Sequence, residues 1–418
     1  MNPMKRTFIF VVIFLLIGMT VSAQGLDISF YIQEYNRSDA TVFSMLDLLK
    51  AVRDEQRADN ENWYYNAITV FIQKLPNFLG SARERYAIEE CSKILFRGLA
   101  EEKNTTAAYQ VWQLLQFYNI SSYQNDGFMM FEAIVTLGQI NARDYLVPLA
   151  DLLTYYNERS ATDAHSKTRM QRVVPALFAA LETLDDIYGV RPIFFASIGW
   201  YDNSINAMAS ESLNRLMNSL GEVINEVIIG IIKDPFNFPR AKNAAWQELL
   251  RTQVSDSSKA KVAVAALEAS YTFAAQSYEG RTLLRTMRMT AFDTVRTMGV
   301  EDDIVYAFLE RAYREAFDTP NTDFEEIILV VRTLTAIKTE SAVDLLTEFL
   351  RWAHARRQSG PWGHTERELI YVLTQAIGST GTQSRTALQL LFTISRSTMY
   401  TEAEQEWANK ALAELTKR

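Results

Sequence analysis

One short pattern recurs along this chain of 418 residues and limits its possible folds more than any other feature. The pentad Thr-Leu-x-x-Ile occupies residues 136–140, 183–187 and 333–337, and weaker copies occupy residues 297–300 and 373–377. The intervals between successive threonines are 47, 114, 36 and 41 residues, and 114 is three times 38. A period of about 40 residues is typical of a repeated helical hairpin. The pentad therefore predicts that each copy ends one helix and precedes the turn to the next.

Composition and helix-start signals favour the same all-α fold class. Glycine (16 residues) and proline (9 residues) are both scarce, whereas all-β folds and glycine-rich cofactor folds need many tight turns. The S/T-x-x-E capping box, in which a hydroxyl and a carboxylate each accept a backbone N–H, occurs at residues 81–84, 322–325 and 401–404. Apolar residues between such signals keep helical spacing. We expect about eighteen helices, joined by short turns into antiparallel pairs.

The clearest copy of the pattern supports a resemblance to a known family. Residues 131–140, FEAIVTLGQI, are followed by Leu146-Val147-Pro148-Leu149, and this stretch resembles the turn and second helix of a HEAT repeat. The similarity covers roughly residues 126–418 and is clearest at 131–153, 291–312 and 331–350. It implies an α-solenoid of stacked antiparallel helix pairs, HEAT-like or armadillo-like. Residues 24–125 read as an N-terminal helical segment, either divergent repeats or a cap.

Tetratricopeptide repeats are the alternative repeat family. Trp112, Leu115 and Tyr118 resemble the first helix of that family, but the tyrosine falls one position early. No strict period of about 34 residues follows, so stacking of the HEAT or armadillo kind is the preferred interpretation.

The first residues have the features of a secretory signal. Lys5 and Arg6 precede an apolar or small-residue run at 8–21, and Val21-Ser22-Ala23 forms a small-residue cleavage site. An uncleaved membrane anchor is the alternative, although the run is short for a full span. We expect removal of residues 1–23, export to the periplasm or the extracellular space, and no membrane anchor after cleavage.

The net charge of the chain argues against nucleic acids and anionic membranes as the main partner. The formal net charge is −8, and loss of the two signal-segment cations would make it −10. Nucleic acids and anionic membranes require concentrated Lys and Arg, so neither is the expected main partner. We expect a protein partner instead.

No residue pattern predicts catalysis, a cofactor or a metal. His354, His364, Glu366 and Glu368 could form a zinc site, but their spacing matches no metal signature, and polar residues at a turn are the preferred interpretation. Cys91 is the only cysteine and follows two glutamates, which disfavour a reactive thiolate. Two aspartate pairs, at 185–186 and 302–303, are expected to cap helices.

One cluster combines tryptophans with cations in this acidic chain. We name it as the possible partner contact; its members are Arg351, Trp352, Arg356, Arg357, Trp362 and His364. Arg and Trp dominate binding hot spots. Favourable interaction of cations with the negative end of a helix dipole is the alternative. Further aromatic residues fall in predicted turns, and we expect them to pack over helix ends: Trp200, Tyr201, Phe236 and Phe238.

The resemblance to HEAT proteins implies a non-enzymatic scaffold or protein–protein interaction module. This inference rests on fold analogy rather than on a site. The alternative is an exported α/α-barrel enzyme acting on polysaccharides, because such barrels also consist of helix hairpins with a similar period. The long loops rich in Gly, Trp and Asp that such an active site needs are not evident.

Overall fold

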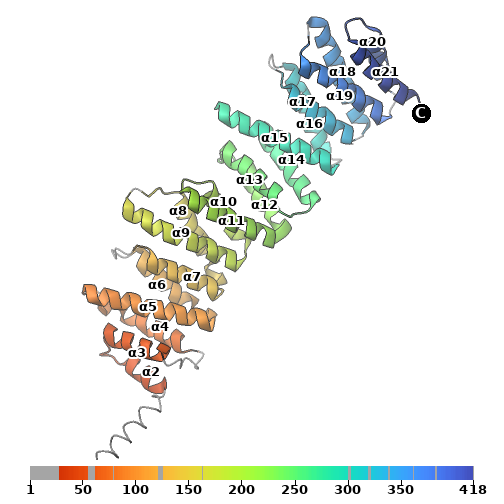
Figure 1. Ribbon diagram of the computed structural model, residues 1–418. Coiled ribbons are helices and arrows are strands. Elements are labelled where there is room, and N and C mark those ends of the chain that lie inside the picture. The colour runs from red at the N-terminus through yellow and green to blue at the C-terminus, as the bar shows by residue number, and fades with distance from the viewer. Residues whose placement is uncertain are drawn as a thin grey trace, which may run out of the picture. The chain divides into compact units, whose positions relative to one another are not determined.

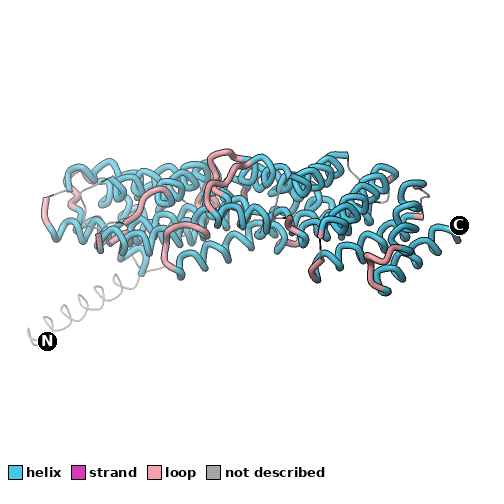
Figure 2. The backbone as a smooth tube through the Cα atoms, turned by 90° about the horizontal axis from the view of Figure 1, so that it is seen from above, coloured by secondary structure: helices cyan, strands magenta, loops and turns pink. Residues whose placement is uncertain are grey.

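The computed structural model describes residues 28–54, 62–78, 80–120, 126–161, 163–299, 303–318, 322–337, 339–360, 362–381 and 384–417. Within these residues the chain is all-helical and forms no β-strand, as Figure 2 shows. The predicted signal segment at residues 1–23 lies outside the described residues. No helix of the described part of the chain is both long and apolar enough to cross a bilayer.

The chain divides into two compact units, one ending at Leu216 and the other beginning at Met217. The division falls inside helix α11 (Asn203–Leu220). Residues on both sides of the boundary predicted between 125 and 126 belong to the first unit, and the helices that flank it pack against each other. The assignment of residues 24–125 as divergent repeats or a cap stays a prediction.

The first unit consists of α-helices joined by short turns, some of which form 3-10 helices. Its α-helices before α11 are α2 (Ile28–Asn36), α3 (Val42–Asp54), α4 (Trp63–Lys74), α5 (Ala82–Glu102), α6 (Ala108–Ile120), α7 (Phe128–Gln139), α8 (Leu146–Asn157), α9 (Ala164–Leu184) and α10 (Val190–Ser197). The 3-10 helices are η1 (Leu75–Phe78), η2 (Thr105–Ala107), η3 (Arg143–Tyr145) and η4 (Ile187–Gly189). Odd-numbered helices pack in sequence order from α3 to α9, while α2 packs against α4, α4 against α6, and α8 against α10 (Figure 1).

The second unit repeats this two-layer packing. After η5 (Gly221–Val223) it contains α12 (Ile224–Lys233), α13 (Pro239–Arg251), α14 (Asp256–Thr272), α15 (Tyr278–Met298), α16 (Asp303–Asp318), α17 (Phe324–Ile337), α18 (Glu340–Ser359), α19 (His364–Thr380), α20 (Arg385–Arg396) and α21 (Glu402–Thr416). Each odd-numbered helix from α13 to α21 packs against the next odd-numbered helix, and each even-numbered helix from α12 to α20 against the next even-numbered one. Adjacent helices of the two layers enclose the apolar core of the unit.

Two of the three predicted capping boxes are confirmed. Ser81 with Glu84 starts α5, and Thr401 with Glu404 starts α21; in each, hydroxyl and carboxylate accept backbone N–H groups reciprocally. The prediction at Thr322 is wrong by one residue. Helix α17 begins at Phe324, and the Asp323 carboxylate accepts the N–H of Glu326. A carboxylate accepts this bond at least as well as a hydroxyl, so Asp323 displaces Thr322 as the cap.

A recurring backbone turn follows several odd-numbered helices. Lys103, Asn141, Asp185, Gly299 and Gly381 adopt left-handed φ angles between 48° and 69° after α5, α7, α9, α15 and α19. A left-handed residue stops a helix and lets its last carbonyls bond to backbone N–H groups beyond the end. The chain therefore reverses in the same way at each of these places.

The left-handed residue of each turn is a fixed point from which equivalent positions in different helices can be counted; we call this alignment the structural register. Thr136 lies five residues before Asn141, and the residues five before Asp185 and Gly299 are Ala180 and Thr294. The predicted alignment of Thr183 and Thr297 with Thr136 is therefore displaced by three residues, about one helical turn. Such a slip preserves the buried face, because residues three apart share one side of a helix.

Burial of the three pentad leucines is confirmed. Leu137, Leu184 and Leu334 are each at most 1% exposed. Leu137 and Leu334 are equivalent, because each follows a threonine whose hydroxyl approaches the carbonyl of a phenylalanine on the preceding odd-numbered helix. Leu184 is not equivalent, because the left-handed residues align Leu137 with Leu181 of α9. All four leucines belong to the core, so burial alone could not fix the register.

Candidate interaction surfaces

The two tryptophans of the possible partner contact are buried. Trp352 on α18 is 8% exposed, and Trp362, in the turn before α19, is 7% exposed. Trp352 lies beside the Phe324 ring of α17, with the ring centroids 6.2 Å apart. Both indoles therefore join neighbouring helices rather than facing solvent.

Two cations of the cluster lie on these aromatic rings. The Arg356 guanidinium sits 5.3 Å from the Phe324 ring centre and 5.8 Å from that of Trp352, and its Nε is 3.7 Å from the Glu366 carboxylate. Arg357 lies 5.5 Å from the Trp362 ring and 5.9 Å from the Tyr400 ring. These contacts link α17, α18, α19 and the turn before α21.

Arg357 is fixed further by the backbone. It donates two hydrogen bonds to the Met399 carbonyl, of 3.1 Å from Nε and 2.7 Å from Nη2. Cation–π attraction and charge-assisted hydrogen bonds both strengthen away from bulk water. Arg357 therefore links the end of α18 to the turn that follows α20.

The remaining two members of the cluster face outward. The Arg351 side chain is 51% exposed and pairs with Glu348 one turn earlier on α18. His364 is exposed as the first residue of α19. The structure thus gathers four of the six predicted contact residues into interhelical packing, with Arg351 and His364 left at the surface.

His354, a residue of the rejected zinc arrangement, has a packing role. Its ring stacks on Tyr400, and its Nδ1 lies 2.8 Å from the Tyr400 hydroxyl. Burial lowers the pKa of His354. Among the described residues no three His, Cys, Asp or Glu side chains are grouped closely enough to hold a metal ion.

Cys91 and Asp186 behave as expected. Cys91 is buried, its Sγ lies 3.8 Å from the Val42 carbonyl oxygen, and burial raises the pKa of the thiol. Asp186 accepts the N–H of Tyr188 at the start of η4. Asp185 has a different role from the one expected, because it supplies the left-handed residue that ends α9. Asp302 lies outside the described residues.

The aromatic residues in turns divide into two groups. Tyr201 is 6% exposed and donates to Asn157 Oδ1 at 3.0 Å, and Trp200 donates its indole N–H to the Asn157 carbonyl at 2.9 Å. Both therefore bond to the last residue of α8; the buried Tyr201 packs over this helix end as predicted, whereas Trp200 is 40% exposed. For Phe236 and Phe238 the prediction is wrong, since they are 89% and 78% exposed.

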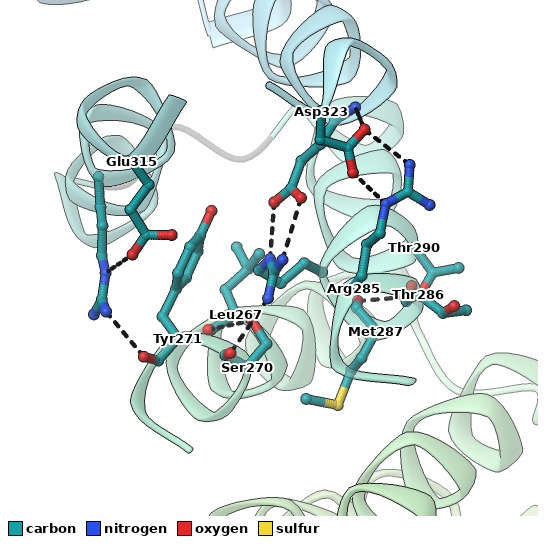
Figure 3. A network of polar contacts seen from close by, with 12 residues as sticks. Leu267, Ser270, Tyr271, Arg285, Thr286, Met287, Thr290, Glu315 and Asp323 are labelled. Carbon is teal, nitrogen blue, oxygen red and sulfur yellow. Dashed lines mark hydrogen bonds and ion pairs between the residues drawn. The ribbon is translucent and has the colours of Figure 1, made fainter. Parts of the chain in front are cut away.

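A polar network between α14, α15, α16 and α17 was not found from the sequence (Figure 3). Arg288 on α15 donates to both Glu326 oxygens on α17, at 2.8 and 3.2 Å. Arg285, one turn earlier, pairs with Asp323 and, at 2.8 Å, with Glu325. Figure 3 shows Arg285 of α15 reaching Asp323, the residue that precedes α17.

Tyr271 of α14 lies at the centre of this network. Its ring is 5.0 Å from the Arg288 guanidinium and 4.9 Å from that of Arg311 on α16. Arg311 also donates to the Tyr271 carbonyl at 2.9 Å and to Glu315 at 2.8 Å. Among the described residues the buried Tyr271 hydroxyl has no hydrogen-bond partner. Desolvation and, second, the Glu326 carboxylate raise its pKa.

A sequence signal for these ion pairs does exist. The Arg285–Asp323 and Arg288–Glu326 pairs each span 38 residues, which is close to the period of about 40 residues predicted from the pentads. Other pairs also join consecutive helices of one layer: Arg97–Glu132, Glu182–Arg215, Glu226–Lys261, Lys233–Glu268 and Arg332–Glu368. Opposite charges one repeat apart, on helices already known to be neighbours, would have predicted them.

Comparison with known proteins gives no identification: no protein-family model, no curated protein and no solved structure matches this chain.

Proposed function

We propose that this protein is an exported, non-enzymatic scaffold whose helix pairs form α-solenoid units resembling HEAT repeats, and that it holds a protein partner along one helix layer. The observation that carries the proposal is the recurrence of one interhelical contact. The Thr136 hydroxyl approaches the Phe96 carbonyl of the preceding odd-numbered helix at 3.5 Å. The Thr333 hydroxyl approaches the Phe292 carbonyl at 3.4 Å.

The two contacts correspond in further details. Each threonine also donates to a carbonyl four residues earlier in its own helix, at 2.8 Å. Phe96 and Phe292 are both completely buried. The contacts span 40 and 41 residues, and they lie in different units. Such a match favours repetition of one structural element over an accidental similarity of helices.

Ion pairs between consecutive helices of the same layer also support a repeat protein. In such proteins each repeat is stabilised mainly by its neighbours, and stacking produces an extended surface rather than a single enclosed site. Extended surfaces of this kind serve to hold partners. Export is likewise a proposal, and its only support is the signal-like sequence of residues 1–23.

Site-specific crosslinking tests the proposal. Cys91 is buried, so a Cys91→Ala background allows single reactive cysteines to be placed at exposed positions. Asp293 and Arg332 are exposed on odd-numbered helices, and Lys261 and Asp344 on even-numbered ones. The chain without residues 1–23, labelled at each position with a photo-crosslinker, is mixed with proteins of its own compartment. We expect one crosslinked partner, obtained from both positions of one layer. Crosslinking from no position, or from one position alone, would argue against a layer-wide contact.

A further inference from the structure

The three most exposed large apolar side chains of the described residues gather on two adjoining loops. Phe236 is 89%, Tyr278 79% and Phe238 78% exposed. The phenylalanines belong to the loop between α12 and α13, and Tyr278 begins α15 directly after the loop that follows α14. The two loops adjoin where α13 and α15 begin, since a Cβ on Gly280 of α15 would come within 3.3 Å of the ring of Pro239, the first residue of α13. We call Phe236, Phe238 and Tyr278 the aromatic knob.

The loop that carries the phenylalanines is held rigidly. Lys242 is only 1% exposed, and its ammonium donates to the carbonyls of Ile232 at 2.7 Å and Asp234 at 2.6 Å. The same ammonium lies 5.0 Å from the Phe273 ring in the second loop, so one buried cation ties the two loops together. Asn237 adds a hydrogen bond of 2.9 Å to the Ile231 carbonyl.

The rigid loop lowers the conformational entropy cost of binding through the aromatic knob. Burial of a lysine is costly unless its charge is well solvated by the protein, and here it satisfies backbone carbonyls at the end of α12. The loop is thereby preorganised, which reduces the conformational entropy lost when its side chains are covered. A rigid loop that points two phenyl rings at solvent is suited to insertion into an apolar medium.

The size of the knob decides between two kinds of partner. Three aromatic side chains bury about 150–250 Å² each when fully covered. Their sum falls below the ~800 Å² that each partner contributes to a stable protein–protein interface. A lipid bilayer requires no matching surface, and aromatic residues are favoured at the level of its headgroups.

The charges around the knob favour anionic headgroups. Arg240 and Arg281 flank the rings, and neither pairs with a carboxylate in the described part of the chain; Arg281 donates to the Gln276 carbonyl at 3.0 Å. Glu279 is the exposed acidic residue beside them, whereas Lys233 is already paired with Glu268. The exposed charges beside the rings that form no ion pair in the described part of the chain are thus two cations and one anion, although the whole chain carries a net charge of −8. Asp234 of the same loop is half-buried and accepts the Phe236 N–H.

We propose that the aromatic knob inserts into the interfacial layer of a lipid bilayer, with Arg240 and Arg281 contacting lipid phosphates. The contact is peripheral and needs neither a membrane-spanning helix nor an overall positive charge. It would place the second unit against a membrane surface while its helix layers remain free for a partner.

Vesicle cosedimentation tests this proposal with the chain lacking residues 1–23. The probes are phosphatidylcholine vesicles with and without phosphatidylglycerol. We expect the protein to bind both, and the anionic vesicles more tightly. Phe236→Ala with Phe238→Ala should weaken binding to both by at least about tenfold, since each ring contributes a large apolar area. Arg240→Gln with Arg281→Gln should remove only the preference for anionic vesicles.

Tyr86→Ala with Phe392→Ala is the matched control, because these residues are also exposed aromatics, at 63% and 57%, on helices α5 and α20. This variant should bind like the unmodified protein. If Phe236→Ala with Phe238→Ala lowers the melting temperature, its weaker binding could reflect unfolding, and a second variant is needed. Phe236→Trp with Phe238→Trp keeps aromatic rings at both positions. It should bind vesicles at least as tightly as the unmodified protein. Failure of the unmodified protein to bind either vesicle would overturn the proposal, even if the knob contacts a protein. Undiminished binding by the alanine variant, or loss of binding by the tryptophan variant, would overturn it too.

Discussion

Single side chains determine how closely neighbouring helices approach. Thr136 and Thr333 satisfy their hydroxyls within their own helices at 2.8 Å, so a polar residue can sit at a completely or nearly completely buried position. The small Gly138 then lets α7 approach α9, because a Cβ there would come within 3.1 Å of Ala180 Cα. The neighbouring leucine fills the space between the layers.

Truncation of these leucines should be costly. Leu137→Ala, Leu184→Ala and Leu334→Ala each remove a fully buried side chain, so each should lower the free energy of unfolding by about 2–5 kcal/mol. Urea unfolding followed by circular dichroism measures this change. Val147→Ala, at a position 44% exposed, serves as the control and should have a much smaller effect. Losses below about 0.5 kcal/mol at all three leucines would contradict the burial described here.

His354 should make stability depend on pH. Burial lowers its pKa in the folded chain below the value of about 6.5 expected in the unfolded chain. As the pH falls through about 6.5, the unfolded chain therefore binds this proton more readily than the folded chain, and the free energy of unfolding decreases. Between pH 7.5 and pH 5, melting temperatures should fall less for His354→Gln than for the unmodified protein. Equal pH dependence in the two proteins would show that His354 makes no such contribution.

At the scale of helices and turns, local signals predicted much of the fold. Ser81 and Thr401 start helices where their capping boxes indicated, because a cap depends on residues within one turn. The repeat register was harder to predict. Thr183 and Thr297 are displaced by one turn, since periodicity of about 3.6 residues makes neighbouring turns alike in sequence. Only the left-handed residues Asp185 and Gly299 fix the register.

The sequence predicted which residues form the possible partner contact, but not whether their side chains point to solvent or to neighbouring helices. The pairing of Arg356 with Phe324 and of Arg357 with Tyr400 depends on side chains about 30 to 40 residues away in sequence. No local pattern reveals whether a tryptophan points to such a neighbour or to solvent. The exposure of Phe236 and Phe238 was missed for the same reason, because Lys242, which fixes their loop, is buried against two loops at once.

The buried part of the cluster should control stability. Arg356→Ala with Trp362→Ala removes an indole that is 7% exposed and a guanidinium that stacks on two rings. Loss of a buried tryptophan typically costs about 3–5 kcal/mol, so the melting temperature should fall by several degrees. Circular dichroism measures the shift. Arg351→Ala with His364→Ala changes only the exposed members and should melt like the unmodified protein. An unchanged melting temperature for the first variant would contradict a packing role and favour the prediction that Trp362 contacts a partner.

At the scale of the whole chain, the expected export makes a prediction about covalent structure. Residues 1–23 combine a charged start, an apolar run and the sequence Val21-Ser22-Ala23. A chain exported from its cell of origin should therefore begin at Gln24. Intact mass spectrometry of the exported protein measures this directly. A mass that still includes the first 23 residues would contradict cleavage, and absence of the protein from the exported fraction would contradict export.

The proposed repeat architecture also predicts how far a local defect spreads. In a repeat protein stability is approximately a sum of repeat and nearest-neighbour contributions, so a cavity weakens its own repeat and those beside it. Leu137→Ala in α7 should therefore increase amide hydrogen exchange in α5, α7 and α9, which pack against one another in sequence order. Helices α17 to α21 of the second unit should keep the exchange rates of the unmodified protein. Leu334→Ala in α17 is the reciprocal variant and should affect α15, α17 and α19 while sparing α3 to α7.

Exchange measured by mass spectrometry under native conditions resolves these segments. A uniform increase along the whole chain would instead indicate one cooperative core, as in a closed globular fold, and would remove the main support for a scaffold built from repeats.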